Sequence, residues 1–167
     1  MTTVEPIIRL VTPADRELVR AMHQRCSVES LAWRCLQPPV RATASGGHDE
    51  VPDPLVDWMF DPELGTTMLI IDPSSGDVVG LAHLTHTDEP GVDAVAFLLE
   101  DTWQGKGLGG KLVDIVTAVA RKRGLRGLTA DVALDNDRML RILFRRGWVC
   151  RPADGAYLAR LDLTERP

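Results

Sequence analysis

Four glycines lie close together in the middle of the chain, at positions 105, 107, 109 and 110. Residues 97–99 before them are apolar, and residues 108–119 after them have apolar side chains at helical spacing. Glycine is unfavourable in a regular element unless the backbone needs a positive φ or must approach another group closely. A helix that starts at such a bend presents unpaired N–H groups and its positive dipole end to an anion. The pattern indicates either a phosphate site or a flexible glycine loop without a ligand.

Two known phosphate motifs match this segment only in part. Gly105 and Gly110-Lys111 fit a Walker loop, but Leu112 stands where a hydroxyl is needed for Mg²⁺. A dinucleotide G-x-G-x-x-G turn also fits, and Asp131 lies at about the distance of its ribose-binding acid. That turn should follow an early strand, whereas this one comes late in the chain. Neither motif is favoured.

The composition is typical of a globular protein. The 167 residues, 44% hydrophobic and 26% charged, fit one domain over 1–167. The net charge of −5 argues against a nucleic-acid partner, and no apolar run is long enough for a membrane span. Cys26, Cys35 and Cys150 are too widely spaced for a disulfide framework or a metal site. We therefore expect a cytoplasmic protein with no metal, no nucleic acid and no membrane partner, and homodimerisation is left open.

Elements that would position the glycine segment can be read on both sides of it. The first half predicts a strand at 7–11, a helix that begins at Thr12-Pro13-Ala14-Asp15, a second helix capped by Ser27, and a helical turn at 54–60. Residues 37–54 are rich in proline and predict a long loop. This loop either lines a substrate site or is a mobile excursion.

The second half predicts a meander followed by alternating helices and strands. Its expected elements are an antiparallel hairpin of 68–71 and 78–86, strands at 92–99, 128–134, 148–150 and 156–161, a helix from Leu108 to Gly124, and a helix that begins at 135–137 and ends at Gly147. The order β-α-α-β-β-β-α-β-α-β-β predicts an α/β fold. A mixed, mostly antiparallel sheet of about seven strands would have helices on both faces.

The segment Gln104-x-x-Gly107-x-Gly109 resembles the acetyl-CoA signature of the GCN5-related N-acetyltransferase (GNAT) family, Arg/Gln-x-x-Gly-x-Gly/Ala. A second segment, from Asn136 to Gly147-Trp148, is similar to the family's Asn-x-x-(Met/Ala) helix and its Gly-Phe ending. The element order is also that of the GNAT fold. The resemblance covers residues 7–161 and implies a GNAT acetyltransferase domain that uses acetyl-CoA.

The resemblance is closest to the Pat-type protein lysine acetyltransferase domains. Arg9, Pro13 and Asp15 look like one element of that branch, and Ser27-x-Glu29-Ser30 looks like another. The segment from Ala94 to Gly105 resembles its core strand and loop. The implied acceptor is a protein lysine, or else a small amine.

The resemblance also implies the residues that bind the cofactor. The diphosphate would bind backbone N–H groups of the glycine bend, the acetyl carbonyl would lie near the end of the preceding strand, and an asparagine would lie near the pantetheine arm. Lys106 or Lys111 could add positive charge. The expected cofactor-binding residues are Leu98, Leu99, Gln104, Gly105, Lys106, Gly107, Leu108, Gly109, Gly110 and Asn136.

The proton acceptor is the weak point of the resemblance, because Ala94 stands where the Pat-type branch has its glutamate base. An alkyl ammonium must lose its proton before it attacks a thioester. Asp93, His83 and Glu100 are the catalytic candidates, with His86 behind them. Alternation places Asp93 on the opposite face of the strand from Ala94 unless the strand bulges. Water alone could also carry the proton.

The expected function is an acetyl-CoA-dependent N-acetyltransferase in which the amine attacks the thioester directly in a ternary complex. Because the usual base is missing, the alternative is a non-catalytic acyl-CoA-binding regulatory domain. A nucleotide-binding module is the third and weakest interpretation.

Overall fold

The structure is a computed structural model that describes residues 5–165. These residues form a seven-stranded sheet in the order β1-β2-β3-β4-β5-β7-β6. Neighbouring strands are antiparallel, except that β4 and β5 are parallel. The strands are β1 (Ile7–Leu10), β2 (Gly65–Ile71), β3 (Val78–His86), β4 (Val92–Leu99), β5 (Gly127–Ala133), β6 (Val149–Ala153) and β7 (Ala156–Asp162).

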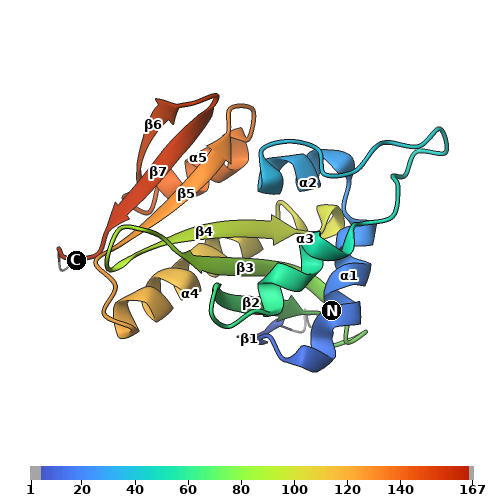
Figure 1. Cartoon of the computed structure of the whole chain (residues 1–167), viewed down its shortest axis with the longest axis horizontal. Coiled ribbons are helices and arrows are strands. Elements are labelled where there is room, and N and C mark those ends of the chain that lie inside the picture. The colour runs from blue at the N-terminus through green and yellow to red at the C-terminus, as the bar shows by residue number, and fades with distance from the viewer. Residues whose placement is uncertain (1–4, 166–167) are drawn as a thin grey trace.

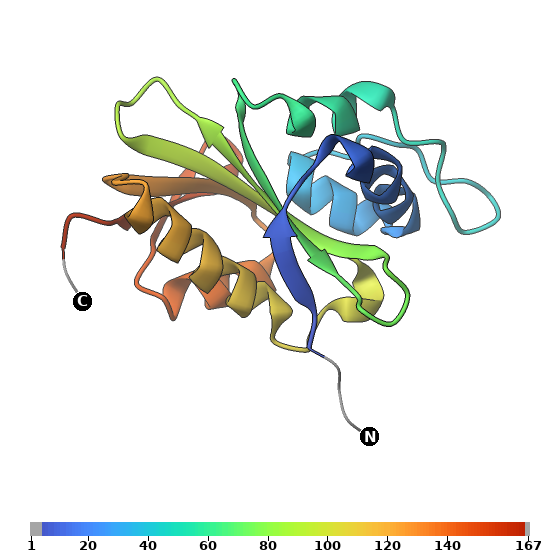
Figure 2. The same cartoon turned by 90° about the horizontal axis from the view of Figure 1, so that it is seen from below.

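Helices cover both faces of the sheet (Figures 1 and 2). One face carries α1 (Arg16–Arg25), α2 (Val28–Cys35) and α3 (Asp53–Asp57), and the other carries α4 (Leu108–Lys122) and α5 (Asp137–Phe144). Three short 3-10 turns complete the chain: η1 (Pro13–Asp15), η2 (Trp58–Phe60) and η3 (Asp101–Trp103). The predicted fold class and element order are confirmed. Within residues 5–165, none of the helices has the length and apolar character needed to cross a bilayer.

The core is split into two layers by the alternation of side chains along each strand. On β4, Val95 packs into the layer under α4, whereas Leu98 packs into the layer under α1 and α3. The pairing of β3 with β4 runs without a register shift from Gly80↔Leu99 to His86↔Asp93. Each β4 side chain therefore lies on the face that alternation predicts, and Asp93 faces away from Ala94.

The strands β4 and β5 part after a short pairing, which opens the middle of the sheet (Figure 1). Residues Val92, Asp93 and Ala94 pair with Gly127, Leu128 and Thr129, and the pairing then ends. Beyond Ala94, β4 keeps β3 as its strand neighbour on the other side. The backbone groups of β4 that point toward β5 are therefore available in this gap.

Two boundaries differ from the sequence-based expectation for physical reasons. Strand β2 begins at Gly65, earlier than expected, and the absence of a Cβ lets Gly65 lie directly against the backbone of Leu84. Trp148 precedes β6 because its N–H donates to Leu143 O at 3.2 Å and so ends α5. Residues 37–52 of the predicted loop form no helix, and their one β-bridge joins Ala42 to His48, whereas residues 53 and 54 already belong to α3.

Candidate active site

The glycine bend sets the start of α4. Gly105 and Gly107 have φ values of 73° and 82°, and a Cβ at either position would have open space around it. Glycine is therefore needed at both positions for the left-handed backbone conformation, not for lack of space. The first helical hydrogen bond runs from Lys111 N to Gly107 O at 3.2 Å. The N–H groups of the three residues before Lys111 consequently have no helical acceptor.

The other two glycines allow α5 to approach α4 closely. A Cβ on Gly109 would lie 3.2 Å from Ile142 Cδ1, and one on Gly110 would lie 2.5 Å from Arg146 Nη2. Arg146 is fixed in place because it donates to both carboxylate oxygens of Asp114, at 2.7 and 3.1 Å. The bend thus combines two glycines that shape the backbone with two that make room for a helix.

A cleft of about 420 Å³ extends from this bend to the end of β4. It is lined from α2, β4, the bend, α4 and α5. Among its lining residues are most of those that sequence reasoning assigned to the cofactor: Leu98, Leu99, Gln104, Gly105, Gly107, Gly109, Gly110 and Asn136. Lys106 and Leu108 are not among them. Lys106 Nζ lies 5.0 Å over the Trp103 ring, and Leu108 is buried.

The cleft is electropositive. Arg138, Arg145 and Arg146 contribute to its lining. Lys111, the other expected source of charge, lies beside Glu5, with 3.5 Å between Nζ and Oε1. Within residues 5–165, no three His, Cys, Asp or Glu side chains come together in a way that would hold a metal ion. The cleft therefore suits an anionic ligand that is held by arginines and backbone N–H groups.

The end of β4 supplies backbone donors to the cleft. Glu100 N donates to Val79 O at 2.9 Å, so the N–H groups of alternate residues, including Leu98, are directed toward β3. The N–H groups of Phe97 and Leu99 are then directed into the gap between β4 and β5. The Leu98 side chain packs into the core under α1 and α3, whereas Leu99 offers a backbone donor to the gap.

Side-chain hydrogen bonds hold the walls of the cleft together. Gln104 Nε2 donates to Leu99 O and to Ser30 Oγ, each at 2.9 Å. Gln104 Oε1 accepts from Arg138 Nη1 at 3.1 Å. Asn136 caps α5, since its Oδ1 accepts from Met139 N at 3.2 Å, which leaves its amide NH₂ for a ligand. The two polar motif residues thus build the cleft as well as line it.

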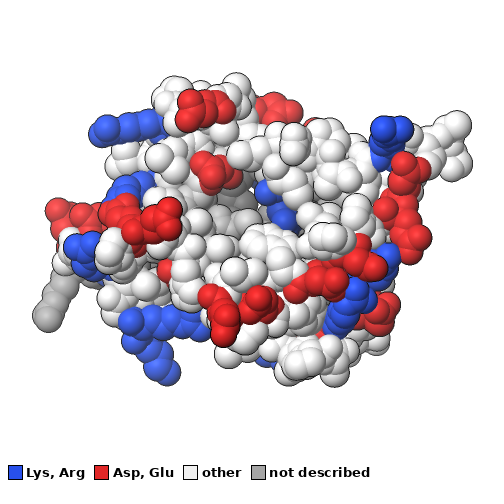
Figure 3. Space-filling model, in the orientation of Figure 1, with Lys and Arg blue, Asp and Glu red and all other residues white. Residues whose placement is uncertain are grey.

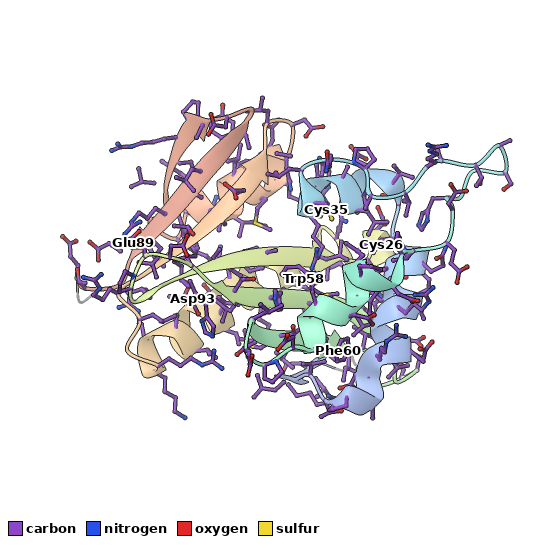
Figure 4. The ribbon with its side chains drawn as sticks, viewed as in Figure 1. Cys26, Cys35, Trp58, Phe60, Glu89 and Asp93 are labelled. Atoms are coloured by element: carbon purple, nitrogen blue, oxygen red, sulfur yellow. The ribbon has the colours of Figure 1, made fainter. Side chains whose placement is uncertain are left out.

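Asp93 is not brought to the cleft. Its side chain is buried on the far half of β4, where His86 Nδ1 lies 3.2 Å from its Oδ1. At about 3.3 Å per residue, its Cα lies roughly 16 Å from that of Leu98. In Figure 4, Asp93 lies on the Glu89 side of the view, and Cys35 lies on the opposite side. His86, the weaker candidate, is an exposed neighbour of Asp93.

Glu100 and His83 also lie outside the cleft lining. Glu100 Oε2 is paired with Arg25 Nε at 3.1 Å. His83 is fully buried, and its ring packs edge-on against Trp58 with 4.4 Å between centroids. Burial, and then the charge of Arg34, lower the pKa of His83 to about 4. A histidine this weakly basic is a poor acceptor for an ammonium proton.

A smaller hollow continues the cleft into the gap between β4 and β5. Its volume is about 30 Å³, and it shares Trp33, Phe97, Asn136 and Met139 with the cleft. Its further lining includes Arg34 from α2 and Asp131 from β5. Figure 3 shows the sunken middle of this face, with basic atoms on its wall. Sequence reasoning missed Arg34, because nothing in its local pattern distinguishes it from a surface arginine at the end of a helix.

Comparison with known proteins identifies the family. The model of the acetyltransferase (GNAT) family matches residues 26–148, most of the chain. The GNAT domain of S. lividans PAT has a TM-score of 0.78 and 24% identity, with 95% of this chain and 90% of that one covered. A GNAT superfamily phosphinothricin acetyltransferase from Sinorhizobium meliloti, in complex with acetyl-CoA, has a TM-score of 0.70 and 12% identity, with 94% and 86% covered.

A third similar structure is the ribosomal-protein-S18-alanine N-acetyltransferase from Escherichia coli. It has a TM-score of 0.70 and 14% identity, with 97% of this chain and 96% of that one covered. At these identities the structural likenesses show a common fold. The match of the family model to residues 26–148 goes further, and the chain belongs to the acetyltransferase (GNAT) family.

Proposed function

We propose that the protein transfers the acetyl group of acetyl-CoA to a primary amine, by direct attack of the amine while both substrates are bound. The observation that carries this proposal is the junction of two sets of backbone donors in one cleft. The first turn of α4 supplies one set, and the unpaired edge of β4 supplies the other. The Sinorhizobium meliloti structure, which has the same fold, contains acetyl-CoA.

In this proposal the glycine bend binds the diphosphate. The backbone N–H groups from Gln104 to Gly110 are the donors, so Lys106 and Leu108 contribute through their backbones although their side chains lie elsewhere. The helix start is favourable for negative charge. Arg145, which lines the same cleft, adds positive charge near it.

The acetyl end of the cofactor would lie against β4. The thioester carbonyl becomes an oxyanion when the amine attacks, and the N–H of Leu99 is directed into the gap where it can stabilise that charge. Asn136 would bind the pantetheine arm through its amide NH₂. The acceptor would then approach from the side of the hollow beyond Phe97.

The amine must lose a proton before or during attack. None of Asp93, His83 and Glu100 lines the cleft or the hollow, whereas Asp131 lines the hollow. We therefore propose Asp131, directly or through a water molecule, as the proton acceptor. The three cysteines are unpaired, which suits the reducing cytoplasm as the proposed location.

Calorimetric titration followed by an activity assay tests the function. We expect acetyl-CoA to bind with micromolar affinity, and ATP and NAD not to bind. The protein should then release free CoA thiol when primary amines are added. If acetyl-CoA binds but no amine causes thiol release, the protein is a non-catalytic acyl-CoA-binding domain. If acetyl-CoA does not bind, the cofactor assignment is wrong.

A matched pair of glycine variants tests the diphosphate position. Gly107 and Gly124 flank α4, have φ values of 82° and 75°, and both have open space at the Cβ position. Gly107→Glu and Gly124→Glu should each cost about 1–2 kcal/mol of stability through backbone strain. In Gly107→Glu a carboxylate also lies next to the diphosphate. We expect this variant alone to weaken acetyl-CoA binding in calorimetry, by more than tenfold. Equal affinities in the two variants would contradict the placement.

A further inference from the structure

Arg34 has no carboxylate partner among residues 5–165. Its Nη2 lies 3.2 Å from Met59 Sδ, its Nη1 lies 3.8 Å from Cys35 Sγ, and its Nε is closed to solvent without an acceptor. Sulfur is a weak hydrogen-bond acceptor. A buried charge normally has a partner of opposite charge. Burial accordingly lowers the pKa of the Arg34 guanidinium from its usual value.

Arg34 differs in this respect from the arginines that form ion pairs. Carboxylates lie within 3.2 Å of Arg9, Arg16, Arg20, Arg25, Arg146 and Arg160. Each of those arginines is thus largely neutralised by the chain itself. Arg34 instead brings a positive charge without a carboxylate partner among the described residues to the partly buried wall of a hollow that is open to a ligand.

The guanidinium of Arg34 is held rigidly. Its Cζ lies 5.4 Å from the centroid of the Trp58 ring, a cation–π arrangement. Trp58 is fixed in turn, because its Nε1 donates to Leu55 O at 3.0 Å and its ring packs against His83. An arginine packed on a fixed ring keeps its donors in one orientation. Such preorganisation favours recognition of a planar acid group.

The histidine next to this ring offers no negative charge to Arg34. Thr67 Oγ1 donates to Met59 O at 2.8 Å, so it accepts from His83 Nδ1 at 2.6 Å. His83 is therefore a neutral ring with its proton on Nδ1. Among the described residues that line the hollow, Asp131 is the one acidic residue, and it forms no ion pair with Arg34, so a bound anion would supply the balancing charge.

Arg34 lies close to the place where the proposed reaction would occur. The hollow that it lines includes Ala96 and Phe97 of β4, next to the Leu98 and Leu99 end where the acetyl group would lie. Two residues of strand span about 7 Å. An acid group that fills the hollow beside Arg34 would thus lie within about 7 Å of the attacked carbon. The hollow, at about 30 Å³, has room for a group of carboxylate size.

We propose, on the basis of the acetyltransferase function above, that the acceptor is a small amine that carries a carboxylate, such as an amino acid, and that Arg34 binds this carboxylate. Asp131 lies on the opposite wall and accepts the amine proton. The neutral nitrogen then forms the C–N bond, the C–S bond breaks, and its electron pair leaves with sulfur. The nitrogen then loses its second proton, which passes through solvent to the CoA thiolate, and Asp131 releases the first proton to solvent. A protein lysine has no acid group this close to its amine.

Paired acceptors test the proposal. Each 2-amino acid of a panel is compared with the same amine without its carboxylate, for example phenylalanine with phenethylamine, by release of CoA thiol. In the wild type we expect kcat/KM to be about 10- to 100-fold higher for the acid-bearing member of the best pair. Arg34→Met keeps an unbranched stem but removes the guanidinium, and it should abolish this preference. Acetyl-CoA affinity in calorimetry should remain unchanged. Arg34→Lys should keep part of the preference.

Arg41→Met serves as a control, since Arg41 is an exposed residue of the 37–54 segment. It should leave the preference intact. The proposal is overturned if Arg34→Met retains the preference, or if lysine peptides react better than every amino acid. Circular dichroism establishes whether each variant is folded. If Arg34→Met does not fold, Arg34→Lys is compared with the wild type instead, and an unchanged preference in Arg34→Lys would contradict the proposal.

A binding measurement that does not depend on catalysis tests the carboxylate site separately from the acetyltransferase function. Trp33 lines the hollow and Trp58 packs on Arg34, so intrinsic tryptophan fluorescence should change when amino acids are added to the CoA-saturated protein. If no amine releases thiol but amino acids still shift the fluorescence of the wild type and not of Arg34→Met, catalysis fails while the carboxylate site stands. If amino acids neither react nor shift the fluorescence, the carboxylate site is overturned.

Discussion

Gln104 uses all the polar atoms of its side chain inside the protein. Its two N–H groups reach Leu99 O and Ser30 Oγ, and its oxygen accepts from Arg138. The residue that opens the glycine signature therefore has no side-chain group left for a ligand. Its contribution to an anion is its backbone N–H. Its side chain sets the distance between α2, the end of β4 and α5.

The side chains of Arg9 and Asp15, which resemble the start of the Pat-type domains, also have a structural role. Both carboxylate oxygens of Asp15 accept from Arg9, at 2.7 and 2.8 Å, and Thr12 N adds a third bond at 2.7 Å. The Arg9 guanidinium and the Thr12 donors hold the pKa of Asp15 well below its usual value, against the opposing effect of burial. These residues fasten β1 to η1 and lie outside the lining of the cleft.

Cys26 provides a prediction at this scale. It is buried, and burial, followed by the nearby carboxylates of Asp101 and Glu100, raises its pKa to about 12. Since the thiolate is the reactive form, native Cys26 should not react with a disulfide reagent at pH 8. Digestion and mass spectrometry after brief labelling should find Cys26 unmodified in the native protein and modified in urea. Modification of native Cys26 at the rate of a free peptide thiol would contradict this burial.

The position of α2 over the cleft depends on one carboxylate in η3. Asp101 accepts from Ser27 N at 2.8 Å, from Ser27 Oγ at 2.6 Å and from Ser30 Oγ at 2.9 Å. Burial raises the pKa of Asp101, but these hydrogen bonds outweigh burial and leave it below its usual value. The start of α2 is thereby joined to the turn that leads into the glycine bend.

We expect Asp101→Ala to destabilise the protein by about 1–3 kcal/mol, because the donors of Ser27 and Ser30 lose their acceptor. Urea unfolding measures this loss. Asp72→Ala is the matched control, since Asp72 also accepts from backbone and hydroxyl donors but within a single exposed turn. It should cost less, and acetyl-CoA affinity should fall only in Asp101→Ala. An equal loss in both variants would show that the link to α2 is unimportant.

The features that sequence predicted correctly are the local ones. Ser27 as a helix cap, Gly107 before α4 and Asn136 before α5 follow from capping and backbone rules that need only neighbouring residues. Arg34 could not be found in this way. Its environment is made by Met59 and Trp58 from η2 and by the hollow beside β4, which come together only in the folded sheet.

The catalytic candidates show the same limit. Alternation correctly placed Asp93 on the opposite face from Ala94, but periodicity does not say where along a strand a cleft lies. That position depends on where β5 leaves β4, after Ala94. Asp131 lies on β5 beyond this point and so lines the hollow, although its sequence neighbourhood suggested only a ribose-binding acid. The pairing of β4 with β5, which is distant in sequence, therefore determines both that Asp93 lies outside the cleft and that Asp131 lines the hollow.

On the scale of the whole molecule, stability should depend on two buried histidines. Burial lowers the pKa of His23 to about 4, with a smaller effect from the charge of Arg34, and His83 behaves alike. Between pH 6.5 and about 4, the unfolded chain binds protons that the folded protein does not. The free energy of unfolding should therefore be fully retained above pH 6.5 and fall as the pH drops through this window, by on the order of 2–3 kcal/mol per histidine.

Urea unfolding between pH 7.5 and pH 4.5 measures this slope. His23→Gln and His83→Gln should each flatten it, whatever their effect on stability at pH 7.5. His86→Gln is the control, because the His86 side chain is exposed. A slope that is the same in all three variants and the wild type would show that the buried histidines are not its source. Asp15 and Asp101, whose pKa values are lowered, add a separate loss only below about pH 4.

The short pairing of β4 with β5 also has a mechanical consequence. Only Val92–Ala94 joins the two strands, so this pairing acts as a joint between the β1–β4 and β5–β7 parts of the sheet. The end of β4 lies roughly 16 Å from the joint. A rotation of about 10° at the joint would therefore shift that end by about 3 Å, close to the length of two methylene groups. The β4 wall of the cleft would then move relative to its α5 wall, so a small change of angle would alter the width of the cleft.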